Sequence, residues 1–260
     1  MNIYQKLKKI KFIIEKLDIK LAASKLLEPY KFTYQDQVLG IDSVENKTFH
    51  HSLFCDFLSH KMQQRFEDAY YNKSQLIKAF GKSLVNHSNL TILDATSGFG
   101  YDAIEMSVKA KKVIMLEQSE IIYALLQNGL ERLQSSLELE SDAAFDSGAS
   151  DVDLLCFNKT FQDYVKEHDL ENENIDIDIV YLDPMYPKEN KKSAQNKKYM
   201  QYLQDLTQNS IQDVELLDLA FKIVKHKIIL KRPIHAEVIY PKKVCYQVKS
   251  KLVRYDVYLP

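Results

Sequence analysis

A carboxylate held in a proline-rich turn is the most informative feature of this sequence. Residues 179–189 read Ile-Val-Tyr-Leu-Asp-Pro-Met-Tyr-Pro-Lys-Glu, so an apolar strand leads directly into Asp183. Pro184 and Pro187 restrict the backbone of the turn, and Tyr186 lies between them. A hydrogen-bond acceptor beside a flat aromatic ring suits a planar base that is held through its exocyclic amine. The turn therefore predicts chemistry on a nucleobase.

A second turn, about ninety residues earlier, carries two glycines after another strand. Residues 94–100 read Asp-Ala-Thr-Ser-Gly-Phe-Gly. Gly98 and Gly100 allow the backbone to turn tightly and to approach a ligand without a clash from Cβ. The helix that follows points its N-terminus at that ligand, which favours a carboxylate such as that of methionine. Asp94 either holds the turn or reaches the methionine amine, and the sequence leaves both interpretations open.

Glu117 ends the next predicted strand, seventeen residues after Gly100. An acidic side chain at this point accepts hydrogen bonds from the ribose hydroxyls in dinucleotide-binding folds. A glycine pair alone is weak evidence, because purely structural turns also contain it, but the pair together with Glu117 favours a nucleoside cofactor. NAD is disfavoured, since Asp94 and the Asp-Pro-Met-Tyr run have no role in hydride transfer. The predicted cofactor is S-adenosyl-L-methionine (SAM).

The chemistry of methyl transfer explains why an acceptor is needed. The exocyclic amine of guanine or adenine is a poor nucleophile, because its lone pair is delocalised into the ring. The Asp183 carboxylate or the Pro184 carbonyl could hold one N–H and redirect the lone pair, while Tyr186 stacks on the base for about 1–3 kcal/mol. In-line placement supplies about 7–11 kcal/mol. Because SAM is already activated, we expect no metal. The predicted catalytic residues are Asp183, Pro184 and Tyr186.

Lysines border the predicted base pocket. They could neutralise phosphates, which would make binding sensitive to salt, or they could simply solvate a surface loop. Two further cations follow a later strand on the same rim. The predicted RNA-binding residues are Lys188, Lys191, Lys192, Lys197, Lys198, Lys231 and Arg232.

Composition sets further limits. Charge is distributed unevenly: residues 1–100 carry +4, residues 101–180 carry −12 and residues 181–260 carry +7. A basic surface attracts phosphates whatever the net charge of the whole protein. The three cysteines are far apart and form no CxxC pair, which indicates neither a zinc site nor a disulfide framework. No stretch of eighteen apolar residues and no signal peptide are recognisable, so we expect a cytoplasmic protein without a membrane span.

Strands and helices are predicted to alternate from about residue 90. The predicted strands cover residues 90–94, 112–117, 152–157, 175–182 and 226–231, followed by a hairpin over 244–248 and 252–259. The predicted helices cover residues 102–110, 120–133, 161–167 and 203–224, with a surface loop over 135–151. This alternation favours an α/β fold with a mostly parallel, doubly wound Rossmann-like sheet that binds ligands at the carboxyl ends of its strands. The antiparallel C-terminal hairpin is typical of class I SAM-dependent methyltransferases.

Three units are predicted along the chain. Residues 1–55 form a small N-terminal α/β unit with strands near 11–14 and 49–54, a helix capped by Asp18 and a turn at Asp36. Residues 56–87 form a helical connection. Residues 88–260 form the SAM-dependent methyltransferase domain.

The motifs resemble those of the RsmJ family, which methylates N2 of a guanosine in bacterial 16S ribosomal RNA. The resemblance rests on residues 94–103, 115–118 and 124–130, and above all on Val-Tyr-Leu-Asp-Pro-Met-Tyr-Pro over 180–187. It continues in residues 192–194, 197–200, 231–233 and 254–258. The resemblance covers residues 55–260 well and the first fifty residues only loosely. The family usually has Arg where Tyr101 stands, Phe where Tyr186 stands, and a glycine-rich basic stretch near residues 65–73.

The resemblance implies a set of cofactor contacts and a substrate. The implied function is SAM-dependent methylation of guanine N2 in the RNA of the small ribosomal subunit. One alternative is methylation of adenine N6 or of another exocyclic amine in DNA or RNA, although Met185 replaces the proline of the common Asp-Pro-Pro-Tyr signature. The other is a non-catalytic RNA-binding protein with a SAM fold. With the residues argued above, the cofactor set is Asp94, Gly98, Gly100, Tyr101, Asp102, Glu117, Gln118, Asn158, Lys159 and Asp183.

Overall fold

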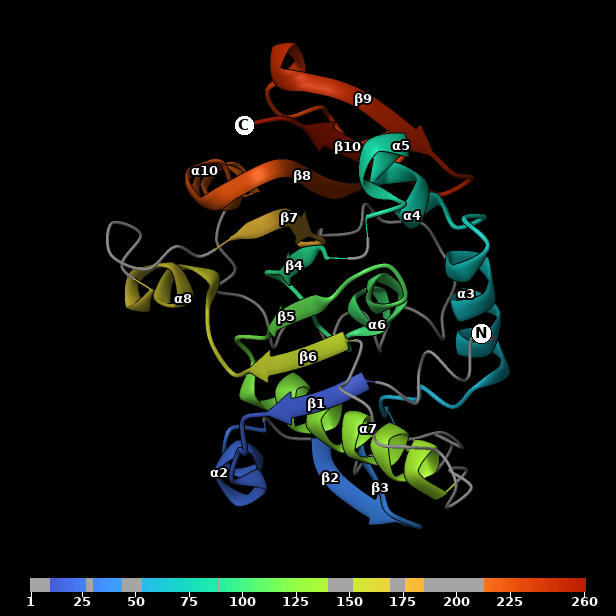
Figure 1. Cartoon of the computed structure of the whole chain (residues 1–260). Helices are drawn as coiled ribbons and strands as arrows, with labels where there is room; N and C mark the ends of the chain where they lie inside the picture. The colour runs from blue at the N-terminus through green and yellow to red at the C-terminus, as the bar shows by residue number, and fades with distance from the viewer. Residues whose placement is uncertain are drawn as a thin grey trace.

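The computed structural model of the chain describes residues 10–26, 30–43, 53–87, 89–139, 152–168, 176–184 and 213–260. These residues build one large twisted sheet with helices on both faces (Figure 1). The order of the strands across the sheet is β1-β6-β5-β4-β7-β8-β10-β9. The strands are β1 (Ile10–Ile14), β4 (Thr91–Asp94), β5 (Lys112–Leu116), β6 (Val152–Phe157), β7 (Ile177–Leu182), β8 (Val224–Pro233), β9 (Val244–Lys249) and β10 (Val253–Tyr258).

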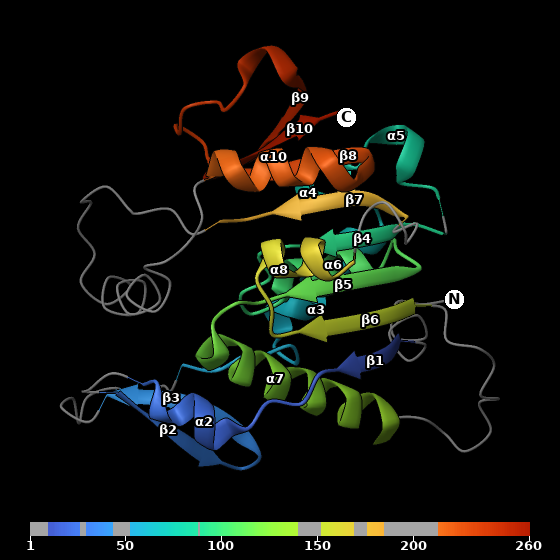
Figure 2. The same ribbon diagram turned by 90° about the vertical axis from the view of Figure 1, so that its left-hand side faces the viewer.

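In this sheet β1, β6, β5, β4, β7 and β8 are parallel to one another. Strands β10 and β9 close the sheet in antiparallel pairing. Figure 2 shows the arrowheads of β6, β5 and β7 pointing to one side of the molecule. The chain moves outward from β4 through β5 to β6 and then returns to β7 on the other side of β4. In an open parallel sheet this reversal opens a crevice at the carboxyl ends of the two central strands, where ligands bind. The doubly wound fold and the closing hairpin are confirmed.

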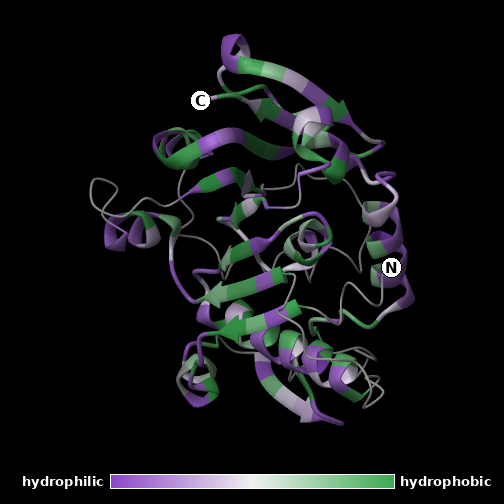
Figure 3. Ribbon diagram, viewed as in Figure 1, coloured by the Kyte–Doolittle hydropathy of each residue, from purple (hydrophilic) through white to green (hydrophobic). Residues whose placement is uncertain are grey.

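Alternate residues of the central strands face two separate hydrophobic layers. Ile92 points into the layer with helices α3 to α7, and its neighbour Leu93 points into the layer with α8 and α10. This twofold alternation is expected for a buried strand, and Figure 3 shows mainly hydrophobic colouring on these strands. The helices are α3 (His60–Tyr70), α4 (Gln75–Ala79), α5 (Gly81–Leu84), α6 (Tyr101–Ser107), α7 (Glu120–Leu139), α8 (Phe161–Glu167) and α10 (Asp213–Ile223). None of the helices within the described ranges has the length and apolar character needed to cross a bilayer.

The N-terminal residues contribute to two sheets. Strand β1 pairs in parallel with β6 at the edge of the large sheet, whereas β2 (Tyr30–Gln35) and β3 (Val38–Ser43) form a separate hairpin. Asp18 caps α2 (Ile19–Ser24) as predicted, by accepting a hydrogen bond from Lys20 N at 2.8 Å. Apolar residues of α2 and β3 pack on α7. The unit boundaries at residues 55 and 87 stay predictions.

The tight turn between β2 and β3 contains Asp36 and Gln37, both with positive φ. A two-residue loop of this kind matches the twist of a β-hairpin. Of the strand predicted over 49–54, residue Leu53 makes an isolated bridge to Ile41, and residues 49–52 lie outside the described ranges.

Some predicted boundaries are wrong. Helix α7 continues to residue 139, so residues 135–139 are helical and not part of a loop. Leu133 and Leu137 extend the apolar face of this helix by one further turn, which explains its length. Strand β8 starts at Val224, directly after α10 ends at Ile223. Predicted elements over 152–157 and 161–167 match β6 and α8.

Candidate active site

The backbone that follows β4 is hydrogen-bonded to the strands on both of its sides. Ala95 N donates to Tyr181 O of β7 at 3.1 Å, and Ser97 N donates to Leu116 O of β5 at 2.9 Å. These contacts are possible because parallel strands end at the same edge of the sheet. They bring the carboxyl ends of β4, β5 and β7 together in one crevice.

Glu117 extends this arrangement at the end of β5. Its carboxylate accepts hydrogen bonds from Gly98 N at 2.9 Å and from Ser119 N at 2.7 Å. Burial raises the pKa of Glu117 to about 7, and the backbone donors oppose this effect only in part. Gln118 is exposed beside it. The Asn158 side chain donates to the carbonyl oxygen of Glu117 at 2.8 Å, so the end of β6 joins the same crevice.

The two glycines of the turn have different reasons to be glycine. Both have positive φ, +54° at Gly98 and +72° at Gly100. A Cβ at Gly98 would meet no atom within 4 Å, so the backbone here faces open space that a ligand can enter. A Cβ at Gly100 would come within 2.5 Å of Met115 Cε and 2.7 Å of Leu126 Cδ1. Gly100 therefore serves the packing of the core and the start of α6, and the open space lies at Gly98.

Asp183 is tied to the same turn through Thr96. The Asp183 amide donates to Thr96 Oγ1 at 2.6 Å, and the Thr96 amide donates to Asp94 Oδ1 at 3.2 Å. Of the two interpretations of Asp94, this contact favours the one in which it holds the turn. Burial raises its pKa well above the usual range, and the negative charges of Asp102 and Asp183 add to this effect.

Lys231 at the end of β8 bridges two carboxylates. Its Nζ lies 2.7 Å from Asp183 Oδ2 and 2.8 Å from Asp102 Oδ2. Burial lowers the pKa of Lys231, but the two carboxylates together raise it above its usual value. For Asp183, burial raises the pKa to about 6 while Lys231 acts in the opposite direction. Lys231 thus favours the charged form of Asp183.

Arg65 extends the ion-pair network to helix α3. It pairs with Asp102 and donates from Nε to Glu105 Oε2 at 2.7 Å. Burial alone would raise the pKa of Asp102, but Lys231 and Arg65 hold it well below the usual range. The hydroxyl of Tyr181 donates to the same carboxylate.

Acidic and basic side chains form one connected network at the crevice. Four acidic residues, Asp94, Asp102, Glu105 and Asp183, lie in one set with the two cations Arg65 and Lys231. Burial raises the pKa of Asp94 and of Glu105, so the two cations are balanced mainly by Asp102 and Asp183. Among the residues that the structure describes, no group of three or more His, Cys, Asp or Glu side chains is arranged to hold a metal.

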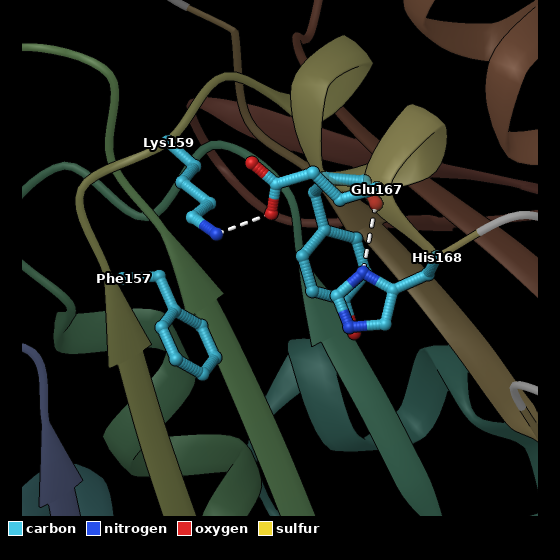
Figure 4. A pocket seen from close by; sticks show the side chains of 5 residues that line it. Phe157, Lys159, Glu167 and His168 are labelled. Atoms are coloured by element: carbon cyan, nitrogen blue, oxygen red, sulfur yellow. Dashed lines mark hydrogen bonds and ion pairs between the residues drawn. The ribbon is translucent and has the colours of Figure 1, made fainter.

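A pocket of about 380 Å³ lies beyond the end of β6 (Figure 4). Phe157, the last residue of β6, and Lys159, two residues later, line one side of the pocket. Glu167 and His168 line it from the end of α8. Lys159 forms an ion pair with Glu167 and lies 5.9 Å from the centre of the Phe157 ring. Asn158, which is bonded to Glu117, lies in sequence between the pocket residues Phe157 and Lys159, and the cofactor contacts of Asn158 and Lys159 stay predictions.

The remaining predicted residues lie in different surroundings. The Tyr101 hydroxyl accepts a hydrogen bond from Asp56 N at 3.0 Å, and its ring packs edge-on against Phe57. Arg232 is buried and paired with Asp213. Lys231 and Arg232 are both paired with carboxylates of the chain, and the phosphate contacts expected of them stay predictions. Pro184 is buried next to Asp183. The predicted residues outside the described ranges are Tyr186, Lys188, Lys191, Lys192, Lys197 and Lys198.

Sequence reasoning missed Arg65, Thr96 and Tyr181. Arg65 lies on an amphipathic helix 37 residues before the carboxylate it meets, so its spacing carries no signal. Thr96 and Tyr181 belong to segments that the motifs had identified, yet their roles depend on which hydrogen-bond partner lies across the sheet.

Comparison with known proteins adds independent information. Residues 14–260 match the model of a family of SAM-dependent methyltransferases. Proteins named ribosomal RNA small subunit methyltransferase J are similar to this chain. The one from Desulfotalea psychrophila is 30% identical over 96% of this chain and 91% of its own length. The one from Alteromonas mediterranea is 33% identical over 91% and 85%.

A solved structure shows the same fold. The crystal structure of a SAM-dependent methyltransferase from Neisseria gonorrhoeae aligns with 96% of this chain and 95% of its own, with a TM-score of 0.57 and 21% identity.

The two glycines offer a matched test of the packing argument. Gly100→Ala should lower the free energy of unfolding by about 2–4 kcal/mol, because its Cβ meets Met115 and Leu126 in addition to the strain of a positive φ. Gly98→Ala carries only the backbone strain and should cost about 1–2 kcal/mol. Urea unfolding followed by circular dichroism measures both. Equal losses in the two variants would refute the assignment of Gly100 to the core.

The raised pKa of Glu117 predicts a pH dependence of stability. The neutral carboxyl is favoured in the fold, so its contribution to stability is complete below about pH 4.5 and is lost as the pH rises through about 7. Glu117→Gln should flatten this fall, a change on the order of 3 kcal/mol across the interval. Urea unfolding from pH 4.5 to 8 measures it. The variant Glu215→Gln, at an exposed position, should keep the wild-type profile, and an unchanged profile in Glu117→Gln would contradict the burial argument.

Proposed function

We propose, from the premise that this chain belongs to the ribosomal RNA small subunit methyltransferase J family of SAM-dependent methyltransferases, that it methylates the exocyclic N2 amine of a guanosine in 16S ribosomal RNA. Its substrate is then the small ribosomal subunit or its RNA, in the cytoplasm. The observation that carries the proposal is the convergence of Gly98, Glu117 and Asp183 through one hydrogen-bonded turn. This arrangement supports neighbouring sites for a nucleoside cofactor and a target base.

The residues present fit SAM, which supplies an already activated methyl group when bound. The open backbone at Gly98 and the carboxylate of Glu117 are proposed to hold its ribose side. Asp94 holds the turn in place by accepting a hydrogen bond from the Thr96 amide. The further proposed contacts are Gly100, Tyr101, Asp102, Gln118, Asn158 and Lys159, of which the Tyr101 side chain points away from the crevice.

Asp183 is proposed to accept the hydrogen bond from the target amine. Its carboxylate is anchored on one oxygen by Lys231 at 2.7 Å, and its backbone amide is fixed by Thr96. A carboxylate held in one orientation directs the amine lone pair toward the methyl group and costs little reorganisation during the reaction. With a pKa of about 6, it is largely ionised at neutral pH.

The roles of the remaining predicted residues rest on the sequence. The Pro184 carbonyl is a proposed second acceptor for the amine, and Tyr186 is the proposed stacking partner of the base. The lysines at 188, 191, 192, 197 and 198 are proposed to contact RNA phosphates. Lys231 is proposed to position Asp183 in place of the phosphate contact first expected for it, and its pairing with both carboxylates supports this.

Methyl transfer to ribosomal RNA tests the function directly. Labelled SAM and 30S subunits from a strain that lacks the enzyme should yield N2-methylguanosine, identified by mass spectrometry of the nucleosides. Label in N6-methyladenosine would instead support the adenine alternative. Absence of both label and SAM binding by calorimetry, in a folded protein, would favour a non-catalytic RNA-binding protein.

The pH dependence of turnover tests the pairing of Lys231 with Asp183. The rate constant kcat should fall below about pH 6, because protonated Asp183 is a weaker acceptor for the amine N–H and no longer carries the negative charge that offsets the charge developing on the amine. Lys231→Met removes a charge that lowers the pKa of Asp183, so the acidic limb should move to higher pH, whereas Lys231→Arg should largely restore it. Asp183→Asn should lose most of its turnover. An identical acidic limb in Lys231→Met and the wild type would exclude the proposed positioning role.

A further inference from the structure

The turn between β9 and β10 lies on the same rim as the candidate active site. In the register of the sheet, Arg254 of β10 is opposite both Lys249 of β9 and Arg232 of β8. The turn that follows Lys249 is therefore level with the carboxyl end of β8, where Lys231 reaches Asp183. Strands β9 and β7 are three spacings apart, which is roughly 15 Å.

The turn is held in one shape by its own hydrogen bonds. Ser250 N and Ser250 Oγ both donate to Val253 O at 2.8 Å. Ile234 N, in the segment directly after β8, donates to Leu252 O at 3.0 Å. The turn is thus tied to the end of the strand that carries Lys231, so a ligand that contacts it would be positioned relative to Asp183.

The side chains of the turn suit a nucleic-acid backbone. Lys249 and Lys251 are exposed. Leu252, the last residue before β10, is 74% exposed. The last twenty residues contain five cations and a single carboxylate, Asp256. This carboxylate is buried and paired with Arg254 at 2.9 Å, so it does not offset the charge of the two lysines.

Neighbouring charges on the rim are already neutralised within the fold. Lys231 and Arg232 are paired with carboxylates. No ion pair of Lys249 or Lys251 is found within the described ranges, and the acidic residue nearest to them in sequence, Asp256, is paired with Arg254. The turn therefore presents charge that is available to an outside partner.

We propose that the turn over residues 249–252 docks the RNA backbone beside the target nucleotide. Lys249 and Lys251 contact phosphates, and Leu252 packs against a ribose or an unstacked base. The inference rests on the proposed function, because it places an RNA substrate on this rim. Lysines also protect edge strands such as β9 from pairing with other chains, and the experiment separates that role from docking.

The salt dependence of RNA binding provides the test. With a 16S ribosomal RNA transcript, the double variant Lys249→Gln/Lys251→Gln should reduce the slope of log K against log[salt] by about 1.4–1.8, and weaken binding roughly tenfold at 0.1 M salt. The Michaelis constant for 30S subunits should rise, while the affinity for S-adenosylhomocysteine stays as in the wild type. Leu252→Ser should raise the Michaelis constant without changing the slope, since its contact is apolar.

A matched control removes two charges elsewhere. Lys78 and Lys82 are exposed on α4 and α5, the helices that precede β4 in the chain. The double variant Lys78→Gln/Lys82→Gln should keep the wild-type slope and Michaelis constant.

Two results would overturn the docking role. One is a slope in Lys249→Gln/Lys251→Gln equal to that of the wild type. The other is an equal loss in the control variant, which would indicate non-specific attraction. If the first result is accompanied by aggregation of the turn variant, the lysines are assigned to edge protection. Because binding is measured without turnover, failure of the wild type to methylate guanine would refute the proposed function alone.

Discussion

The pairing of one partly buried lysine with two carboxylates is the interaction on which the candidate site depends. Lys231 joins Asp183 at the end of β7 to Asp102 in the first turn of α6. An isolated carboxylate at this depth would take up a proton, because burial penalises its charged form. With Lys231 in place, Asp183 can be both desolvated and ionised near neutral pH. The same link fixes the position of α6 against the carboxyl ends of the neighbouring strands β7 and β8.

Side chains from α3 and from the start of α4 offset the desolvation cost of this network. Arg65 from α3 balances Asp102 and Glu105, and Ser74, the N-cap of α4, donates to Glu105. The helical connection before the sheet therefore belongs to the electrostatics of the site, although it carries none of the proposed catalytic residues. Removing one partner of such a network leaves a buried charge uncompensated, which typically costs about 3–5 kcal/mol. The helices α3 and α4 are thus coupled to the chemistry through charge as well as through packing.

Two kinds of charged side chain meet at the carboxyl edge of the sheet. The proposed SAM site lies beside Asp102 and Asp183, which are paired with Lys231 and Arg65, whereas the proposed RNA substrate requires cations on the outer surface. The fold separates the two by pairing Lys231 and Arg232 internally and by leaving the lysines of the β9–β10 turn exposed. A single net charge of −1 for the whole chain conceals this arrangement.

The sequence by itself determined the fold class, the cofactor and the order of the motifs, because these depend on local patterns. Strand periodicity, the glycine turn and the Asp-Pro-Met-Tyr run are each contained within a few residues, so β6, α8 and the closing hairpin were predictable. Only the tertiary structure decided which glycine faces open space, that Lys231 pairs with Asp183 and that β1 joins the large sheet. Those outcomes depend on contacts between residues far apart in the chain, and the spacing of side chains along a sequence does not encode which partner lies across a sheet.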